Sequence, residues 1–106
     1  METKDVNQEI KNNDAIMIYF SGENCGVCKA LQPKIQKEFT NNFPKIKQLF
    51  ISASDFPQIA VSFSVFTIPS VVVFFEGKEN LRKSRHISVL QLSDELKRPY
   101  GLLFDN

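Results

Sequence analysis

The fold of this chain is organised around the stretch Ser21-Gly22-Glu23-Asn24-Cys25-Gly26-Val27-Cys28-Lys29. This stretch contains the only two cysteines of the 106 residues, and two residues separate them. The apolar run from Ala15 to Phe20 lies just before it and predicts a strand buried on both faces. After it, apolar residues recur at positions 28, 31, 35 and 39, which is the spacing of one helical face. Cys25 is therefore expected where a strand ends and a helix begins.

This position predicts a reactive thiol at Cys25. The unpaired N–H groups and the positive dipole end of a helix N-terminus both stabilise a thiolate. Cys28 lies one turn further on and is expected to act as the resolving thiol. A purely structural disulfide is a weaker interpretation, because a loop of two residues constrains the unfolded chain very little. A zinc site is also weaker, because zinc usually takes four ligands and the chain offers one histidine and no further cysteine, so two chains would have to share it. The pattern favours a redox dithiol.

Composition predicts a single domain over residues 1–106 with one ordinary core. Apolar residues make up 42% of the chain, which includes ten phenylalanines and no tryptophan, so phenylalanine should fill much of the core. The net charge is +1, with no block of like charge that would indicate binding to nucleic acid or to an acidic membrane. The longest apolar runs are too short to cross a bilayer. The charged start, with no signal-like apolar segment after it, predicts a cytoplasmic location.

The remaining segments predict an α/β fold. One helix separates the first strand from the apolar segment 47–52, and such a β-α-β unit makes the two strands parallel. A shorter helix then leads to the strand 70–75. After the turn Glu76-Gly77-Lys78, a charged strand over residues 81–86 should return along the edge of the sheet. The last helix should begin near Ser88 and stop at Pro99, leaving a tail over residues 100–106.

These features together resemble the thioredoxin family over about residues 15–97. The residues that carry the resemblance are Cys25-Gly26-Val27-Cys28-Lys29, Pro33, Ile68-Pro69 before an apolar strand, Phe74 and Gly77. The resemblance implies a thioredoxin-like, four-stranded mixed sheet flanked by helices on both faces. The family's first strand has no counterpart, so the strand order should be second-first-third-fourth. The resemblance also implies a cis bond between Ile68 and Pro69, with Pro69 placed against Cys25.

The function implied by the resemblance is that of a thiol–disulfide oxidoreductase that reduces protein disulfides. Cys25 and Cys28 would be the catalytic residues. The substrate-binding residues would be Asn24, Gly26, Val27, Ile68, Pro69 and Arg85. No bound cofactor or metal is implied. The expected partners are disulfide-bearing proteins and a separate electron-donating reductase, and a monomer is favoured over a homodimer. The alternative function is a non-catalytic or slow module that binds partners or senses redox state.

The sequence departs from the family at several informative positions. The family's buried aspartate falls at Tyr19 and its lysine partner at Phe50, so both charges are lost together. Cys28 then has no obvious base, which favours the slow alternative. The family's tryptophan falls at Asn24, and a small glycine of its substrate-facing loop falls at Arg85, beside His86. Without the first strand, the edge at residues 47–52 should need cover from the tail, from the N-terminal helix or from a second copy of the chain.

Overall fold

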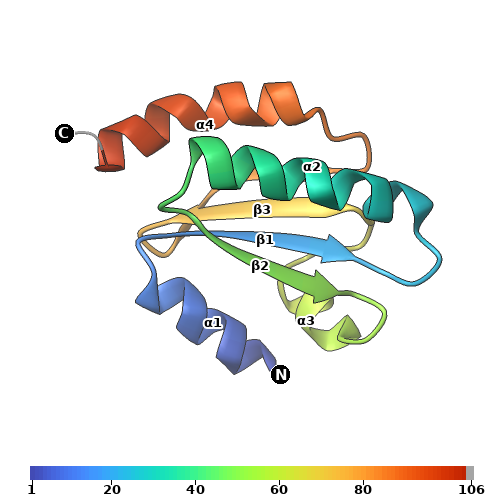
Figure 1. Ribbon diagram of the computed structural model, residues 1–106. Coiled ribbons are helices and arrows are strands. Elements are labelled where there is room, and N and C mark those ends of the chain that lie inside the picture. The colour runs from blue at the N-terminus through green and yellow to red at the C-terminus, as the bar shows by residue number, and fades with distance from the viewer. Residues whose placement is uncertain (105–106) are drawn as a thin grey trace.

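A computed structural model describes residues 1–104, which form four helices and four strands (Figure 1). In chain order these elements are α1 (Thr3–Asn12), β1 (Ala15–Ser21), α2 (Gly26–Asn42), β2 (Lys47–Ser52), α3 (Pro57–Ser62), β3 (Ser70–Phe75), β4 (Lys78–Ser84) and α4 (Val89–Phe104). The strands form one sheet in the order β2-β1-β3-β4. β1 pairs with β2 in parallel and with β3 antiparallel, and β3 pairs antiparallel with β4. The predicted mixed sheet and its strand order are confirmed.

The central strand β1 divides the core into two layers. On one face of the sheet, Met17 and Tyr19 pack with residues of α2 and α4. On the other face, Ile18 and Phe20 pack with residues of α1 and α3. Figure 1 shows these two helix pairs on opposite sides of the sheet. β1 is buried on both faces because each of its two side-chain rows meets a helical layer. This burial fixes the position of the C-terminal end of β1, where the cysteine loop begins.

The β3–β4 hairpin is tighter than the sequence predicts. Glu76 and Gly77 both have positive φ, 51° and 80°, which a two-residue turn of type I′ requires. Pairing therefore resumes at once, with Phe75 opposite Lys78. The predicted returning edge strand is confirmed, but its predicted bounds of 81–86 are wrong, since β4 spans Lys78–Ser84. Arg85 follows the strand with a left-handed φ of 63°.

The last helix is longer than expected, and the prediction that Pro99 stops it is wrong. α4 continues through Pro99 to Phe104. The rings of Tyr100 and Phe43 meet edge to face at 5.1 Å, and the Tyr100 and Phe104 rings lie 4.9 Å apart. The backbone N–H of Lys45 also donates to the Tyr100 hydroxyl at 3.2 Å. Tertiary contacts thus hold the segment after the proline in a helix.

This helical end packs over one face of the sheet and adds no strand to β2. Leu103 and Phe104 contact the core cluster between the sheet, α2 and α4. Within residues 1–104, β2 pairs only with β1. α1 reaches β2 through an ion pair between Glu9 and Lys47. The prediction that the tail covers the exposed backbone edge of β2 is therefore wrong. Pairing of this edge with a second copy of the chain stays a prediction.

Deleting residues 101–106 should lower the free energy of unfolding by about 1–3 kcal/mol, because Leu103 and Phe104 lose their partial burial. The association state in solution should not change, since the deleted helical end does not pair with β2. Urea unfolding and analytical ultracentrifugation measure the two quantities. Leu90→Ala is the matched control on the same helix, because Leu90 is 78% exposed and should cost little. Unchanged stability after the deletion would show that this packing contributes nothing.

Candidate active site

The two cysteines lie at the junction between the cysteine loop and α2 and are joined in a disulfide. Cys25 is the N-cap residue of α2, and its sulfur accepts a hydrogen bond from the backbone N–H of Cys28 at 3.2 Å. Cys25 is partly exposed, whereas Cys28 is buried, with 1% of its surface accessible. The predicted location of Cys25 between a strand and a helix is confirmed. One sulfur can be approached from solvent and the other cannot.

The electrostatic surroundings favour negative charge on the Cys25 sulfur in the reduced state. No acidic residue lies in the first turn of α2. The free N–H groups of that turn and the helix dipole stabilise an anion at the N-cap position. This is the physical basis of a lowered thiol pKa at helix N-termini.

A groove of about 640 Å³ opens beside Cys25. The Ile68–Pro69 bond on its wall is cis, as the resemblance implies. The lining residues come from the cysteine loop, from the segment before β3 and from the end of the hairpin: Asn24, Cys25, Gly26, Val27, Phe66, Thr67, Ile68, Pro69, Arg85 and His86. All the residues predicted for substrate binding therefore lie around one groove. Cys28 does not line it, which agrees with its burial.

Phe66 and Thr67 are lining residues that the sequence did not single out. Phe66 is 77% exposed, although phenylalanine is usually a core residue. Its place in the loop just before Ile68-Pro69 is the one signal that could have identified it. Periodicity gives no signal in a loop, and for this reason its exposure could not be predicted.

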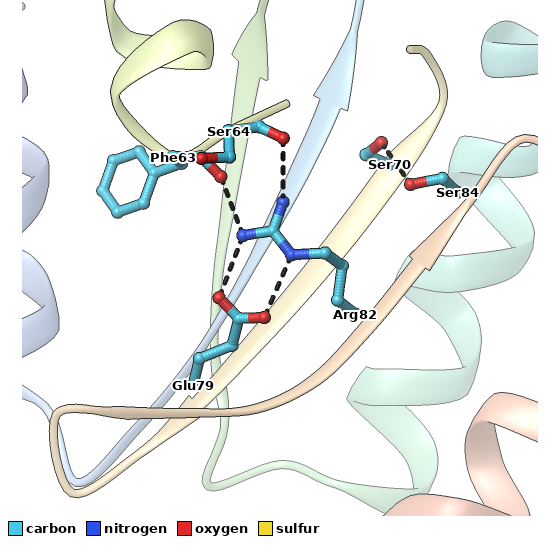
Figure 2. A network of polar contacts seen from close by, with 6 residues as sticks. All are labelled: Phe63, Ser64, Ser70, Glu79, Arg82 and Ser84. Carbon is cyan, nitrogen blue, oxygen red and sulfur yellow. Dashed lines mark hydrogen bonds and ion pairs between the residues drawn. The ribbon is translucent and has the colours of Figure 1, made fainter. Parts of the chain in front are cut away.

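Hydrogen bonds from the hairpin fix the loop that carries Phe66 (Figure 2). At the start of this loop, the Arg82 guanidinium donates to the carbonyl oxygens of Phe63 and Ser64, at 2.7 and 3.3 Å. At its end, the Ser70 hydroxyl donates to the carbonyl of Thr67 at 2.7 Å and lies 2.9 Å from the Ser84 hydroxyl. The groove wall is therefore held at both ends by residues of β3 and β4.

The Arg85 backbone is tied to the same wall. Its N–H donates to the carbonyl oxygen of Pro69 at 2.8 Å. This bond places the Arg85 backbone beside the cis proline, with the side chain exposed on the groove. His86 follows it and is also exposed.

Tyr19 lies beneath the cysteines, where the family has an aspartate. Its hydroxyl donates to the carbonyl oxygen of Cys28 at 2.9 Å, and the residue is fully buried. Burial raises the pKa of Tyr19 to about 12, so the phenol stays protonated at neutral pH. The Phe50 ring lies 6.0 Å from the Tyr19 ring, so the two positions form an aromatic pair instead of a charged one. Neither residue can act as a base toward Cys28 at neutral pH.

Replacing Glu79 with glutamine should reduce the loss of stability in acid. Hydrogen bonds from Arg82 at 2.9 and 3.0 Å lower the pKa of Glu79 below its ordinary value of 4.5. A lowered pKa in the folded state adds stability above pH 4.5, and this stability is lost as the pH falls through the folded value. The effect should be under about 1 kcal/mol, because the pair is partly exposed.

The measurement is urea unfolding of the wild type and of Glu79→Gln between about pH 6 and pH 3. Glu76→Gln is the matched control, since Glu76 is an exposed carboxylate of the same hairpin with no ion pair among residues 1–104. Parallel pH curves for the wild type and Glu79→Gln would contradict the expectation.

Within residues 1–104, no group of three or more His, Cys, Asp or Glu side chains is placed to bind a metal ion. The same residues include no helix that is long and apolar enough to span a membrane.

The geometry defines a redox dithiol at a helix N-terminus, beside a cis proline, in an α/β fold. A family model described as Thioredoxin matches residues 1–98. The chain therefore belongs to the thioredoxin family.

Several known proteins resemble the chain in sequence. Thioredoxin-like protein YdfQ of Bacillus subtilis is 40% identical over 93 residues, which are 88% of this chain and 82% of that protein. The mitochondrial Thioredoxin-2 of Schizosaccharomyces pombe is 31% identical over 75 residues, which are 71% of this chain. The chain spans about half the length of that relative, 56%, and 44% of Thioredoxin-2 of Pyricularia oryzae.

Solved structures agree with the fold. Thioredoxin 1 of Thermosipho africanus is 28% identical, with a TM-score of 0.75 over 83% of this chain and 97% of its own. Oxidised mitochondrial thioredoxin 3 of Saccharomyces cerevisiae has a TM-score of 0.79 over 91% of this chain and 89% of its own, at 24% identity. Because its sequence identity is only 24%, the Saccharomyces cerevisiae structure supports the fold alone.

Proposed function

We propose that the protein is a thiol–disulfide oxidoreductase that reduces protein disulfides through Cys25 and Cys28. The observation that carries this proposal is the asymmetry of the pair. Cys25 caps α2 and opens on the groove, whereas Cys28 lies buried behind it within disulfide distance. A structural disulfide needs no accessible sulfur and no groove beside it.

The reaction begins with both cysteines reduced. The Cys25 thiolate attacks one sulfur of a substrate disulfide, and the other substrate sulfur leaves as a thiolate and takes up a proton. Cys28 then loses its proton and attacks the Cys25 sulfur. This step breaks the mixed disulfide, releases the second substrate thiol and leaves the Cys25–Cys28 disulfide. The substrate gains two electrons, which a separate reductase must return to the protein.

The substrate face of the proposal consists of the groove residues Asn24, Gly26, Val27, Ile68, Pro69 and Arg85. A cytoplasmic location and a monomeric single domain over residues 1–106 belong to the same proposal. A reducing compartment would keep the dithiol able to reduce its substrates.

A second candidate is a module that reacts slowly and serves to bind partners or to sense redox state. The observation that favours it is the Tyr19–Phe50 pair. With a phenol of pKa about 12 beneath Cys28, the resolving thiol has no general base at these positions. The two candidates differ in the rate of the resolving step.

The test combines a rate and a labelling order. With dithiothreitol as electron donor, an oxidoreductase should reduce insulin much faster than dithiothreitol alone, whereas a slow module should add little to the dithiothreitol rate. In the reduced protein, a limiting amount of iodoacetamide should label Cys25 before Cys28, because only Cys25 is accessible. Labelling of Cys28 first, read by peptide mass spectrometry, would reverse the proposed roles. Stoichiometric zinc in the purified protein would instead support the metal-bridged alternative.

A further inference from the structure

We propose that the groove beside Cys25 selects disulfides flanked by carboxylates, and that Arg85 binds the carboxylate with His86 beside it. This inference rests on the proposed function, because it names the class of substrate that the same site prefers. Arg85 is then a specificity-determining residue. The carboxylate is a glutamate or aspartate close to the reactive cysteine of a protein substrate.

The charge of the groove is the first support. Its lining includes Arg85 and His86 but no aspartate or glutamate. The Arg85 side chain makes no ion pair with any of residues 1–104. The other arginine of the hairpin, Arg82, is held by Glu79 and two carbonyl groups. An exposed, unpaired guanidinium beside an uncharged wall attracts anions and can bind a carboxylate with two hydrogen bonds.

The position of Arg85 is the second support. Its backbone has a φ of 63°, a region that non-glycine residues adopt uncommonly. A glycine would meet no steric penalty there, so the conformation itself does not call for an arginine. The N–H bond to Pro69 at 2.8 Å places its backbone next to the loop that faces Cys25. A large cation thus occupies a backbone position with a left-handed φ on the rim of the groove.

A second hollow next to the groove extends the surface that Arg85 lines. This hollow of about 420 Å³ is lined by Val27, Leu31 and Ile87, and Arg85 and His86 line it too. Arg85 and His86 therefore line both hollows, and a substrate segment in either one passes the Arg85 charge. Phe66 and Val27, 77% and 62% exposed, provide apolar contact on the same surface. The segment that fits is apolar with an acidic residue near its cysteine.

The groove is preformed, which favours selection by charge. Arg82 holds the start of the loop that carries Phe66, and the Ser70–Ser84 contact holds its end (Figure 2). A fixed wall holds the Arg85 backbone in place, so the loop needs no ordering at the moment of binding. Carboxylates beside a substrate disulfide repel an attacking thiolate, and a guanidinium at this place offsets that repulsion.

The experiment compares two symmetric disulfide dimers, one of the peptide Ala-Glu-Cys-Glu-Ala and one of Ala-Lys-Cys-Lys-Ala. Each rate with reduced protein is divided by the rate of the same peptide with dithiothreitol, which removes intrinsic reactivity. The wild type should prefer the acidic dimer by about 10-fold at low salt, and added salt should reduce the preference. Arg85→Gly should lose most of it, and Arg85→Lys should keep most of it. Arg98→Ala, which removes an exposed cation of α4 outside the groove lining, is the matched control and should keep it fully.

A wild-type preference near one, or an equal preference in the wild type and Arg85→Gly, would overturn this inference. A neutral substrate, dipyridyl disulfide, tests the proposed function separately. If the wild type does not react with it, the proposed function fails. Binding of the two peptides with serine in place of cysteine, measured calorimetrically, then decides the charge preference alone. Tighter binding of the acidic peptide supports it, and equal binding overturns it.

Discussion

Cys25→Ser should abolish the reduction of protein disulfides, whereas Cys28→Ser should turn the protein into a trap for its substrates. Loss of the attacking thiolate removes the first covalent step, so the rate should fall by roughly three orders of magnitude or more. In Cys28→Ser the first step remains possible, because Cys25 still caps α2 and opens on the groove. The mixed disulfide then forms but has no internal thiol to resolve it.

The measurement is electrophoresis without reductant after each reduced variant is mixed with a disulfide-bearing protein. Cys28→Ser should give a new band of summed mass that dithiothreitol removes. The double variant Cys25→Ser/Cys28→Ser is the matched control and should give none. A covalent adduct from Cys25→Ser but not from Cys28→Ser would assign the nucleophile to Cys28.

The features that were predicted correctly have two sources, the local pattern of apolar residues and the family resemblance. The apolar run of β1 and the helical spacing of apolar residues after Cys28 place the dithiol between a strand and a helix, because both signals lie in the local sequence. The sheet order came from the family resemblance, as did the cis bond at Pro69. Periodicity does not encode either feature, since both depend on contacts between distant segments.

The features that were missed depend on tertiary contacts. Pro99 reads locally as a stop, yet the ring of Tyr100 packs on Phe43, which is distant in sequence, and the helix continues. Phe66 is exposed on the groove, and no local pattern separates it from the buried phenylalanines. The hydrogen bond from the Tyr19 hydroxyl to the Cys28 carbonyl is a further feature that the sequence did not indicate. For Tyr100 and Tyr19 the deciding contact joins residues that belong to different elements.

Tyr19→Phe separates the structural role of this hydroxyl from a chemical one. The variant keeps the ring but removes the donor to the Cys28 carbonyl, which should cost about 1–2 kcal/mol of stability. Turnover should change by less than about twofold, because a phenol of pKa about 12 takes no proton at neutral pH. A large loss of turnover with the fold intact, shown by circular dichroism, would mean that the hydroxyl takes part in the reaction.

Tyr19→Asp should destabilise the protein much more, by about 3–5 kcal/mol at neutral pH, because it leaves a cavity and a buried, unpaired carboxylate. Burial raises the pKa of the introduced carboxyl, and a raised folded pKa gives relative stability that is lost as pH increases. The deficit against the wild type should therefore be smaller at pH 5 than at pH 8.

Adding Phe50→Lys to Tyr19→Asp should recover part of this loss. Positions 19 and 50 are paired across β1 and β2, and their rings lie 6.0 Å apart, so an introduced ammonium can reach the introduced carboxylate. Phe50→Lys alone should destabilise the protein, because it replaces a half-buried ring with a charge. A double-mutant cycle by urea unfolding should therefore show a favourable coupling of about 0.5–3 kcal/mol. Additive losses would mean that the two positions cannot hold a charged pair in this chain, and that the aromatic pair is fixed by the surrounding core.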